Sequence, residues 1–257
     1  MRFAIPSYNR PQILIKKTIP TLLKLGVDYS DIDLFLYDDE QVELYSDVRD
    51  INIIKTDILD LGDRLNYILC EHYPVDTEVV LIEDDINSIR KGGTIKGKED
   101  VDKDFFEKGF EITRNEGKHL WGISPTDSYL FQKPGYTTDF RFIIGTLYGV
   151  ITSNTPALKV SITYKQDFER SILYYKMDKG MVRFNDVFCR TAYRAKGGLG
   201  DDKNGREQQE IDACKQMIAK YPDFCYQNKK KEREISLFRN SKIIKIELTK
   251  ACLITDE

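Results

Sequence analysis

Short apolar runs alternate with amphipathic stretches along the first part of the chain. Residues 2–6, 32–37, 51–54 and 78–82 are apolar runs of strand length, and the last is continuous enough to predict a strand covered on both faces. Residues 12–25 and 61–73 carry apolar side chains at helical spacing, although Pro20 weakens the first helix. This order predicts an α/β fold with a mostly parallel central sheet flanked by helices.

The rest of the chain is less regular. Helices are predicted at residues 105–115, 167–178 and 207–221, with Gly180 ending the second, and strands at residues 120–123 and 140–152. Residues 90–104 and 196–206 are rich in glycine and charged residues and predict loops. A length of 257 residues suits one large α/β domain, so we expect a single domain over residues 1–257.

The composition is that of a soluble globular protein, with 41% hydrophobic and 32% charged residues. The formal net charge of −3 argues against an obligate nucleic-acid coat protein, although a local basic patch is compatible with nucleic-acid contact. Neither a signal peptide nor an apolar run of about 18 residues is visible, and the cysteines are scattered. We therefore expect a cytoplasmic protein with reduced thiols and no membrane anchor, located in the host cytoplasm if the chain is viral.

Acidic residues follow the second and fourth predicted strands. Ligands of open α/β sheets bind outside the carboxyl ends of the strands, so Asp38 and the triplet Glu83-Asp84-Asp85 should face one crevice. While strand geometry lasts, Glu83 and Asp85 point to one side, and at about 4 Å their repulsion costs roughly 4 kcal/mol. A divalent cation, Mg²⁺ or Mn²⁺, removes this cost and bridges the acids to a diphosphate. The alternative is a solvated acidic turn, and for Asp38 alone a turn or helix cap is favoured.

Three further positions carry candidate chemistry. After the first strand, Arg10 could meet a phosphate or a base and Tyr8 could stack on a base, although the segment also fits an ordinary proline-bounded turn. Arg64, in the first turn of its helix, could reach a nucleotide, although a solvent-facing charge is the favoured alternative. Asp167 lies at the start of a predicted helix, which would hold its side chain rigidly enough to act as a general base. The alternative is that its negative charge only complements the helix dipole.

Residues 228–242 form a basic stretch with aromatic neighbours. Such a stretch can grip a diphosphate or a nucleic-acid backbone, or it can be a charged helix face. The sequence leaves both interpretations open. Its cationic residues are Lys229, Lys230, Lys231, Arg233, Arg239 and Lys242, and Lys245 follows shortly after it.

The order of these motifs resembles that of GT-A-fold glycosyltransferases, over roughly residues 1–180. The triplet at residues 83–85 looks like the DxD motif of that family, and residues 167–169 look like its later catalytic acid motif. The remaining similarity lies in residues 7–11, 38–39 and 62–66. Within this fold, residues 5–11 and 166–171 are most similar to phage-type glycosyltransferases that modify hydroxymethylated DNA bases.

This resemblance implies a GT-A-like fold with a smaller acceptor-side region, a UDP-sugar donor and a divalent metal, Mn²⁺ or Mg²⁺. It implies DNA with a hydroxymethylated or glucosylated pyrimidine as acceptor. Residues 1–90 would form the nucleotide-binding half, and residues 91–257 the acceptor-binding and C-terminal half.

The resemblance also implies roles for individual residues. Asp85 becomes the main metal ligand, and Asp167 becomes the base that deprotonates the acceptor hydroxyl, which implies inversion at the sugar carbon. The sequence departs from the family pattern in having Glu83 at the first DxD position and no histidine after Asp167. The residues implied to bind the nucleotide sugar are Pro6, Ser7, Tyr8, Arg10, Asp38, Arg64, Glu83 and Asp84.

Other functions compete with this one. A GT-A enzyme that acts on a glycan, a lipid-linked sugar or a protein fits the acidic total charge, whereas the basic stretch favours DNA. A non-catalytic nucleotide-sugar or nucleic-acid binding module would keep the acids without bringing them to Asp167. A metal-dependent nuclease is disfavoured, because the Glu-x-Lys pattern that it needs is missing from the strands.

Overall fold

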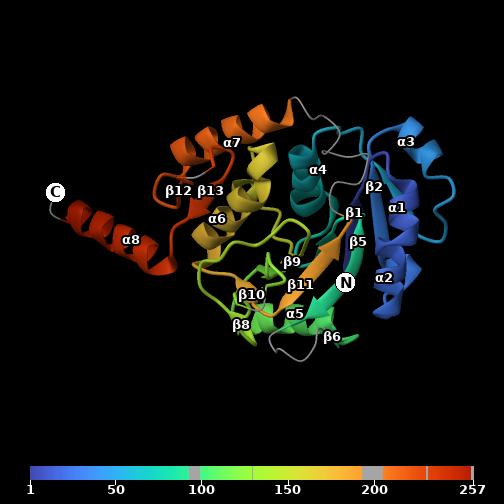
Figure 1. Ribbon diagram of the computed structural model, residues 1–257, viewed down its shortest axis with the longest axis horizontal. Coiled ribbons are helices and arrows are strands. Elements are labelled where there is room, and N and C mark those ends of the chain that lie inside the picture. Colours follow the sequence, from blue (N-terminus) through green and yellow to red (C-terminus); the bar gives the residue numbers. More distant parts are fainter. Residues whose placement is uncertain (93–98, 129, 193–204, 230, 256–257) are drawn as a thin grey trace.

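The computed structural model describes residues 1–92, 99–128, 130–192, 205–229 and 231–255, with side chains described as far as Glu247. Its centre is an eight-stranded sheet with the order β3-β2-β1-β4-β9-β7-β10-β8 (Figure 1). Strands β3, β2, β1 and β4 run parallel, as do β7 and β10, whereas β9 is antiparallel to β4 and β7, and β8 is antiparallel to β10. The mostly parallel sheet is therefore confirmed. Its strands are β1 Arg2–Pro6, β2 Ile32–Leu36, β3 Asn52–Lys55, β4 Glu78–Ile82, β7 Leu120–Ile123, β8 Tyr136–Thr137, β9 Leu147–Ile151 and β10 Val182–Phe184.

Helices cover both faces of this sheet. One face packs against α1, α2 and α5, and the other packs against α4, α6 and α7. Side chains of β1 alternate between the two cores, with Phe3 and Ile5 on the first face and Ala4 on the second, as strand geometry requires. The helices are α1 Pro11–Lys16, α2 Thr18–Lys24, α3 Asp39–Leu44, α4 Leu61–Tyr67, α5 Phe105–Asn115, α6 Gln166–Asp178 and α7 Arg206–Lys220. Short 3-10 turns lie at Tyr29–Asp31, Pro156–Leu158 and Thr163–Lys165, and α4 continues as a π-helix at Ile68–His72.

The helix expected at residues 12–25 is wrong as a single element, because it is broken at Lys17. Lys17 has φ −124° and ψ −76°, so α1 ends there and α2 begins at Thr18. Proline has no N–H and clashes with the carbonyl four residues earlier in a continuous helix. The break places Pro20 in the first turn of α2, where neither the missing bond nor the clash arises.

Several strand predictions also need correction. The strand expected at residues 140–152 occupies only Leu147–Ile151, and residues 90–91 belong to β5 rather than to a loop. Strand β5, Ile86–Lys91, pairs antiparallel with β11, Val187–Thr191, and with β6, Glu99–Asp100, in a three-stranded sheet. Neither β5 nor β11 was predicted. Most of the loop expected at residues 196–206 lies outside the described residues.

Gly180 does not end α6 in the way that was expected. Lys179 takes the left-handed conformation at the end of the helix, with φ 57°. Gly180 is needed for a different reason, because a Cβ there would lie 2.0 Å from the carbonyl oxygen of Thr138. The glycine therefore allows a close approach between two backbone segments.

The C-terminal part forms a two-stranded ribbon, β12 Cys225–Gln227 and β13 Ile235–Leu237, followed by α8, Asn240–Thr255. These elements lie at the left of Figure 1, at the opposite end of the long axis from α1, α2 and α3. The basic stretch expected at residues 228–242 belongs to this end of the molecule.

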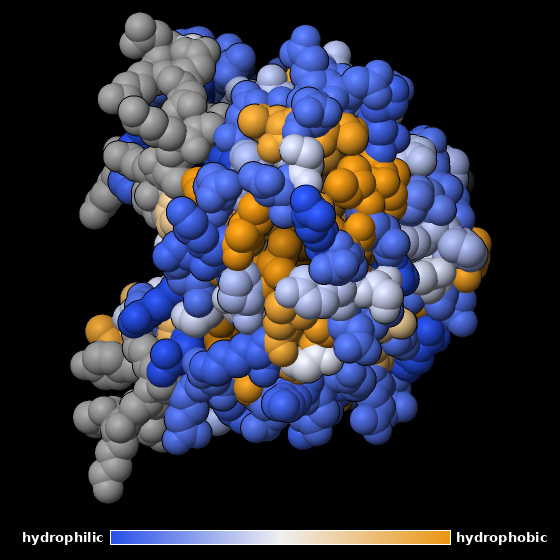
Figure 2. All heavy atoms as spheres, turned by 90° about the vertical axis from the view of Figure 1, so that its right-hand side faces the viewer, coloured by the Kyte–Doolittle hydropathy of each residue, from blue (hydrophilic) through white to orange (hydrophobic). Residues whose placement is uncertain are grey.

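The side that carries α1, α2 and α3 shows apolar surface gathered near its middle within polar surroundings (Figure 2). Apolar surface is common on folded proteins, and we assign this area no role. Within the described part of the chain, no helix combines the length and the apolar character that crossing a membrane requires.

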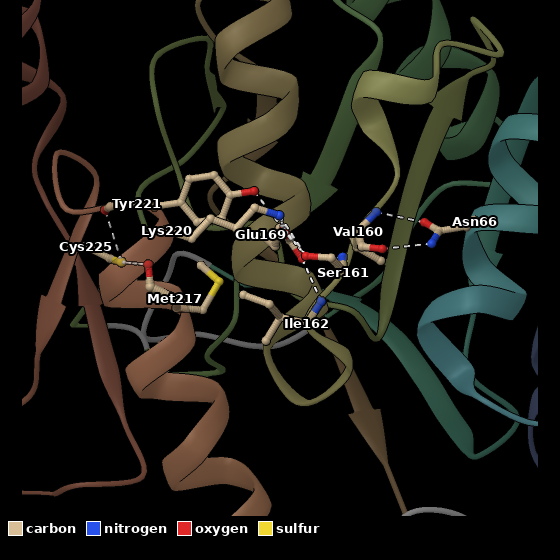
Figure 3. A network of polar contacts seen from close by, with 9 residues as sticks. All are labelled: Asn66, Val160, Ser161, Ile162, Glu169, Met217, Lys220, Tyr221 and Cys225. Carbon is tan, nitrogen blue, oxygen red and sulfur yellow. Dashed lines mark hydrogen bonds and ion pairs between the residues drawn. The ribbon is translucent and has the colours of Figure 1, made fainter.

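Buried Glu169 joins α6, α7 and the segment before α6 (Figure 3). Its carboxylate accepts hydrogen bonds from the backbone N–H groups of Ser161 at 2.7 Å and Ile162 at 2.9 Å. From α7 and its end, Lys220 donates at 2.8 Å and the hydroxyl of Tyr221 at 2.7 Å. Burial alone would raise the pKa of Glu169, but these donors outweigh it and hold the pKa below its ordinary value.

We predict that Glu169→Gln lowers the free energy of unfolding by about 1–3 kcal/mol at pH 7, because an amide leaves buried donors without an acceptor. The lowered pKa of Glu169 contributes stability above the ordinary glutamate pKa of about 4.3, and this contribution is lost as the pH falls further. Urea unfolding at pH 7 and pH 3 should therefore show a smaller difference at pH 3. Glu232→Gln, at an exposed position, is the matched control. An equal effect of both variants would contradict the assignment.

Candidate functional site

Arg10 joins the loop after β1 to the acidic turn after β4. Its Nη2 lies 2.8 Å from Asp84 Oδ1, and its Nη1 lies 3.7 Å from Asp85 Oδ2. Asp84 and Asp85 are buried, and the side chain of Arg10 is only 20% exposed. This geometry neutralises part of the negative charge that two neighbouring carboxylates would otherwise hold in a buried place.

Hydroxyl groups extend this contact into a chain. The backbone N–H of Arg10 donates to the Tyr45 hydroxyl at 2.9 Å, and the Ser7 hydroxyl donates to Asp84 Oδ2 at 2.5 Å. Ser7 and Tyr45 are also 2.5 Å apart, and since the Ser7 proton is used on Asp84, Tyr45 is the donor between them. Three elements, the β1 loop, the end of α3 and the β4 turn, are therefore locked together.

The strand alternation expected to place Glu83 and Asp85 on one side does not apply, because β4 ends before Glu83, although the two carboxylates lie close enough for Asp85 to raise the pKa of Glu83. Strand β4 ends at Ile82, and the chain then turns, so that Asp84 and Asp85 share the side that faces Arg10 while Glu83 is exposed. Thr18 fixes the turn, because its hydroxyl donates to the Glu83 carbonyl at 2.8 Å and accepts from the Ile86 N–H at 2.9 Å. Strand alternation does not apply once the strand has ended.

Asp167 lies near the acidic turn, although it is distant in sequence. A Cβ added at Gly145 would lie 3.8 Å from Asp167 Cβ, and the carbonyl of the next residue, Thr146, accepts from the Glu83 N–H at 3.1 Å. The negative charge of Asp167 also contributes to the raised pKa of Glu83. The structure therefore brings Asp167, Glu83 and the buried acids to one region.

The carboxyl groups of this region hold their protons more strongly than usual. Burial, followed by repulsion from Asp85 and Asp84, raises the pKa of Glu83 to about 7. Burial raises the pKa of Asp84 to about 6, and Arg10 offsets part of that rise. Burial also raises the pKa values of Asp85 and Asp167. Protein atoms surround both carboxyl groups closely enough to raise their pKa values. The residues nevertheless keep contact with solvent, since Glu83 is exposed and Asp167 is partly exposed.

Arg64 is not the solvent-facing charge that was favoured from sequence. It is only 3% exposed, and it donates to three backbone carbonyls, those of Ile58, Ser7 and Leu59, at 2.9, 3.1 and 3.3 Å. Its guanidinium therefore holds the β1 loop against the segment before α4.

The other predicted nucleotide-binding residues lie at the same edge of the sheet. Asp38 caps α3 by accepting from the Gln41 N–H at 2.9 Å, which is the alternative favoured for it alone. Gln41 in turn exchanges two hydrogen bonds with Asn9 of the β1 loop, so Asp38 stands beside that loop. Pro6 is the last residue of β1, and Tyr8 is 36% exposed, which leaves its ring surface open to a stacking partner.

The donor set can be tested against the expected divalent metal. Among the residues that the structure describes, no group of three or more His, Cys, Asp or Glu side chains is placed to hold a metal ion. Asp85 Oδ1, however, is buried and has no hydrogen-bond partner within the described part of the chain. Mg²⁺ usually keeps several waters and is held by one or two carboxylates together with substrate phosphates. A single free carboxylate oxygen fits a site of that kind.

Sequence reasoning missed Tyr45, Gln41, Thr18 and Arg170. Arg170 is only 2% exposed, stacks 3.6 Å from the ring centroid of Tyr148, and offsets the raised pKa of Asp167. No local pattern marks Tyr45, Gln41 or Thr18, because each acts through a contact with a remote segment. For Arg170 the one signal is its position three residues after Asp167, on the same helix face.

We predict that Arg10→Ala destabilises the protein by about 3–5 kcal/mol at pH 8, since two buried carboxylates lose their counter-charge. Without Arg10 the folded-state pKa values of Asp84 and Asp85 rise further, so the penalty appears as these groups ionise with increasing pH. Denaturant unfolding should show a smaller loss at pH 5 than at pH 8. Arg49→Ala, at an exposed position, is the control. A loss that is independent of pH would contradict this interpretation.

The sequence matches no protein-family model and no curated protein. Among solved structures, S. aureus TarS 1–349 in complex with UDP-GlcNAc is similar at 10% identity and a TM-score of 0.50, over 85% of this chain and 67% of that chain. A second structure of S. aureus TarS 1–349 gives 10% identity and 0.46 over 85% and 66%. CMP:2-keto-3-deoxy-manno-octonic acid synthetase complexed with CTP gives 11% and 0.42 over 71% and 87%. The first likeness shows the fold and confirms the expected GT-A-like α/β class.

Proposed function

We propose that this protein transfers a sugar from a UDP-sugar to a hydroxyl group. The observation that carries the proposal is the convergence of Arg10, the acidic turn and Asp167 at the carboxyl ends of β1 and β4. In open α/β sheets this edge is where ligands bind. The likeness to a structure that holds UDP-GlcNAc agrees with this choice of donor.

The donor half of the proposed site is the β1 loop and the β4 turn. The guanidinium of Arg10 can donate two parallel hydrogen bonds to a phosphate group, and its ion pair with Asp84 already fixes its orientation. Tyr8 is exposed beside it and offers a stacking surface for the base. Asp38 and Glu83 supply acceptors for hydroxyl groups of the ribose, while Pro6, Ser7 and Arg64 shape the loop.

Asp85 would hold the divalent metal through its free oxygen, and the metal would neutralise charge on the diphosphate as the sugar departs. The acids of the turn would otherwise repel that diphosphate.

Asp167 is the proposed general base. It takes the proton of the acceptor hydroxyl as the acceptor oxygen forms a bond to the sugar C1 and the bond from C1 to the diphosphate oxygen breaks. UDP carries away the electron pair, and attack from the opposite face inverts C1. Burial raises the pKa of Asp167, which brings it nearer to the working pH and makes it a better base than an exposed aspartate.

The acceptor is the finer part of the proposal. A hydroxymethylated or glucosylated DNA base, which the family resemblance implies, stays a prediction. The basic stretch that favoured DNA lies on the β12–β13 ribbon and α8, where Lys231 pairs with Glu234 at 2.8 Å and Lys242 lies over the Phe238 ring. A glycan acceptor is therefore the second candidate.

We predict that UDP is released when the protein is incubated with Mn²⁺, a UDP-sugar and a suitable hydroxyl acceptor. Asp167→Asn should lower the rate by about 10²–10⁴, the usual contribution of a general base, with little change in UDP-sugar affinity. Asp85→Asn should instead weaken the Mn²⁺-dependent part of UDP binding, measured by calorimetry.

The control for both variants is Asp28→Asn, which removes an exposed carboxylate before β2, at the amino ends of the strands. The acceptor panel contains DNA with hydroxymethylcytosine, glucosylated DNA and neutral glycosides. Absence of UDP-sugar binding, or full activity of Asp167→Asn, would overturn the proposal. Binding without turnover on any acceptor would favour a non-catalytic module.

A further inference from the structure

A cavity of about 690 Å³ opens beside the acidic turn. It lies where β7 ends and β9 begins, with parts of β5 and β11 completing its wall. Its volume is within the range of about 300–1,000 Å³ that small-molecule sites usually have. This cavity was not predictable from the sequence, because its wall comes from four separate segments.

The cavity shares backbone with the proposed catalytic region. Thr146, which lines it, accepts a hydrogen bond from the Glu83 N–H at 3.1 Å. At the end of β11, the residue after the lining Thr191 donates its N–H to the Asp85 carbonyl at 3.0 Å. Because Gly145, next to Thr146, packs on Asp167, a molecule in the cavity would lie beside the proposed base.

The polar groups of the wall are mostly uncharged. Hydroxyl and amide groups both donate and accept hydrogen bonds, as the hydroxyl groups of a carbohydrate do. Ile123 and Ile144 add apolar surface, which suits the C–H groups of a sugar ring. The uncharged polar residues are Asn87, Ser124, Thr126, Thr146 and Thr191.

The charges of the wall balance one another. The two charged lining residues, Asp127 and Arg190, face each other at 3.9 Å, and both are about half exposed. The neighbouring turn adds the carboxylates of Glu83 and Asp85, so the surroundings are acidic. Such a wall offers no excess of positive charge to a phosphodiester backbone, whereas a neutral ligand needs none.

We propose that this cavity is the acceptor subsite and that it binds a neutral, polyhydroxylated molecule, a carbohydrate rather than a nucleic acid. The juxtaposition that carries the inference is a charge-balanced, hydroxyl-lined cavity beside Asp167 and the acidic turn. The reaction that would use it rests on the proposed function, but binding of a carbohydrate in the cavity does not.

Binding is tested first without catalysis. Saturation-transfer NMR with methyl glycosides of glucose, galactose and N-acetylglucosamine should give signals with the wild-type protein. Loss of the Thr126 and Thr191 hydroxyls in a Thr126→Val, Thr191→Val double variant should weaken binding by about 4- to 100-fold, at about 2- to 10-fold for each hydrogen bond. The matched control is Thr137→Val, whose buried hydroxyl has no hydrogen-bond partner among the described residues. The glycosides are tested up to 10 mM, because a dissociation constant of roughly that size is the weakest that matters for a small ligand. Absence of signal at that concentration would overturn the proposal. Equal binding by the wild type and the double variant would overturn it as well.

Turnover is then measured with UDP-sugar and either the glycosides or a hydroxymethylcytosine oligonucleotide. We expect a raised KM for the glycoside in the double variant, with UDP-sugar affinity unchanged. Glycosylation of the oligonucleotide alone would overturn the acceptor assignment while supporting the proposed function. Glycoside binding without any UDP release would leave the cavity assignment standing and would contradict the proposed function.

Discussion

The ion pairs of Arg10 with Asp84 and Asp85 hold the candidate site together. Carboxylates in a buried turn repel each other and lose the solvation of water, so such a turn needs a counter-charge to keep its shape. Arg10 comes from the loop after the neighbouring strand, and parallel pairing of β1 with β4 brings the two segments together. The sheet therefore determines the site, since a change in strand order would separate the charges.

This arrangement also explains the raised pKa values. Arg10 offsets only part of the burial of Asp84, and Glu83 has no comparable partner among the described residues. The region is thus short of positive charge, and a divalent cation would supply what is missing. The charged side chains of the adjoining cavity, Asp127 and Arg190, lie opposite each other, so that cavity adds no net positive charge to the region.

The sequence predicted the parts of the fold that depend on local pattern. The apolar run 78–82 became β4 with its expected ends, and the order of strands and helices correctly indicated a mostly parallel sheet. The order of strands and helices also placed residues 83–85 near the β1 loop, because the carboxyl ends of parallel strands lie at the same edge of the sheet. Helix α5 also has its expected bounds, because its apolar positions repeat at helical spacing over three turns.

Features that depend on remote contacts were not predictable. The Ser7–Asp84 hydrogen bond joins residues 77 positions apart, and no local pattern marks Tyr45 as the third member of that chain. The side on which Asp84 and Asp85 point depends on where β4 ends, and Thr18 from another helix fixes that point. Short strands such as β10, with three residues, have too few positions to show a period.

Paramagnetic NMR tests the central claim most directly. If Mn²⁺ and UDP bind where Arg10 and the acidic turn converge, adding both should broaden the amide signals of the β1 loop, residues 83–86 and the start of α6. Signals at the amino ends of the strands, such as that of Asp28, should remain sharp. Broadening centred on α7 or the β12–β13 ribbon, or none at all, would contradict the account.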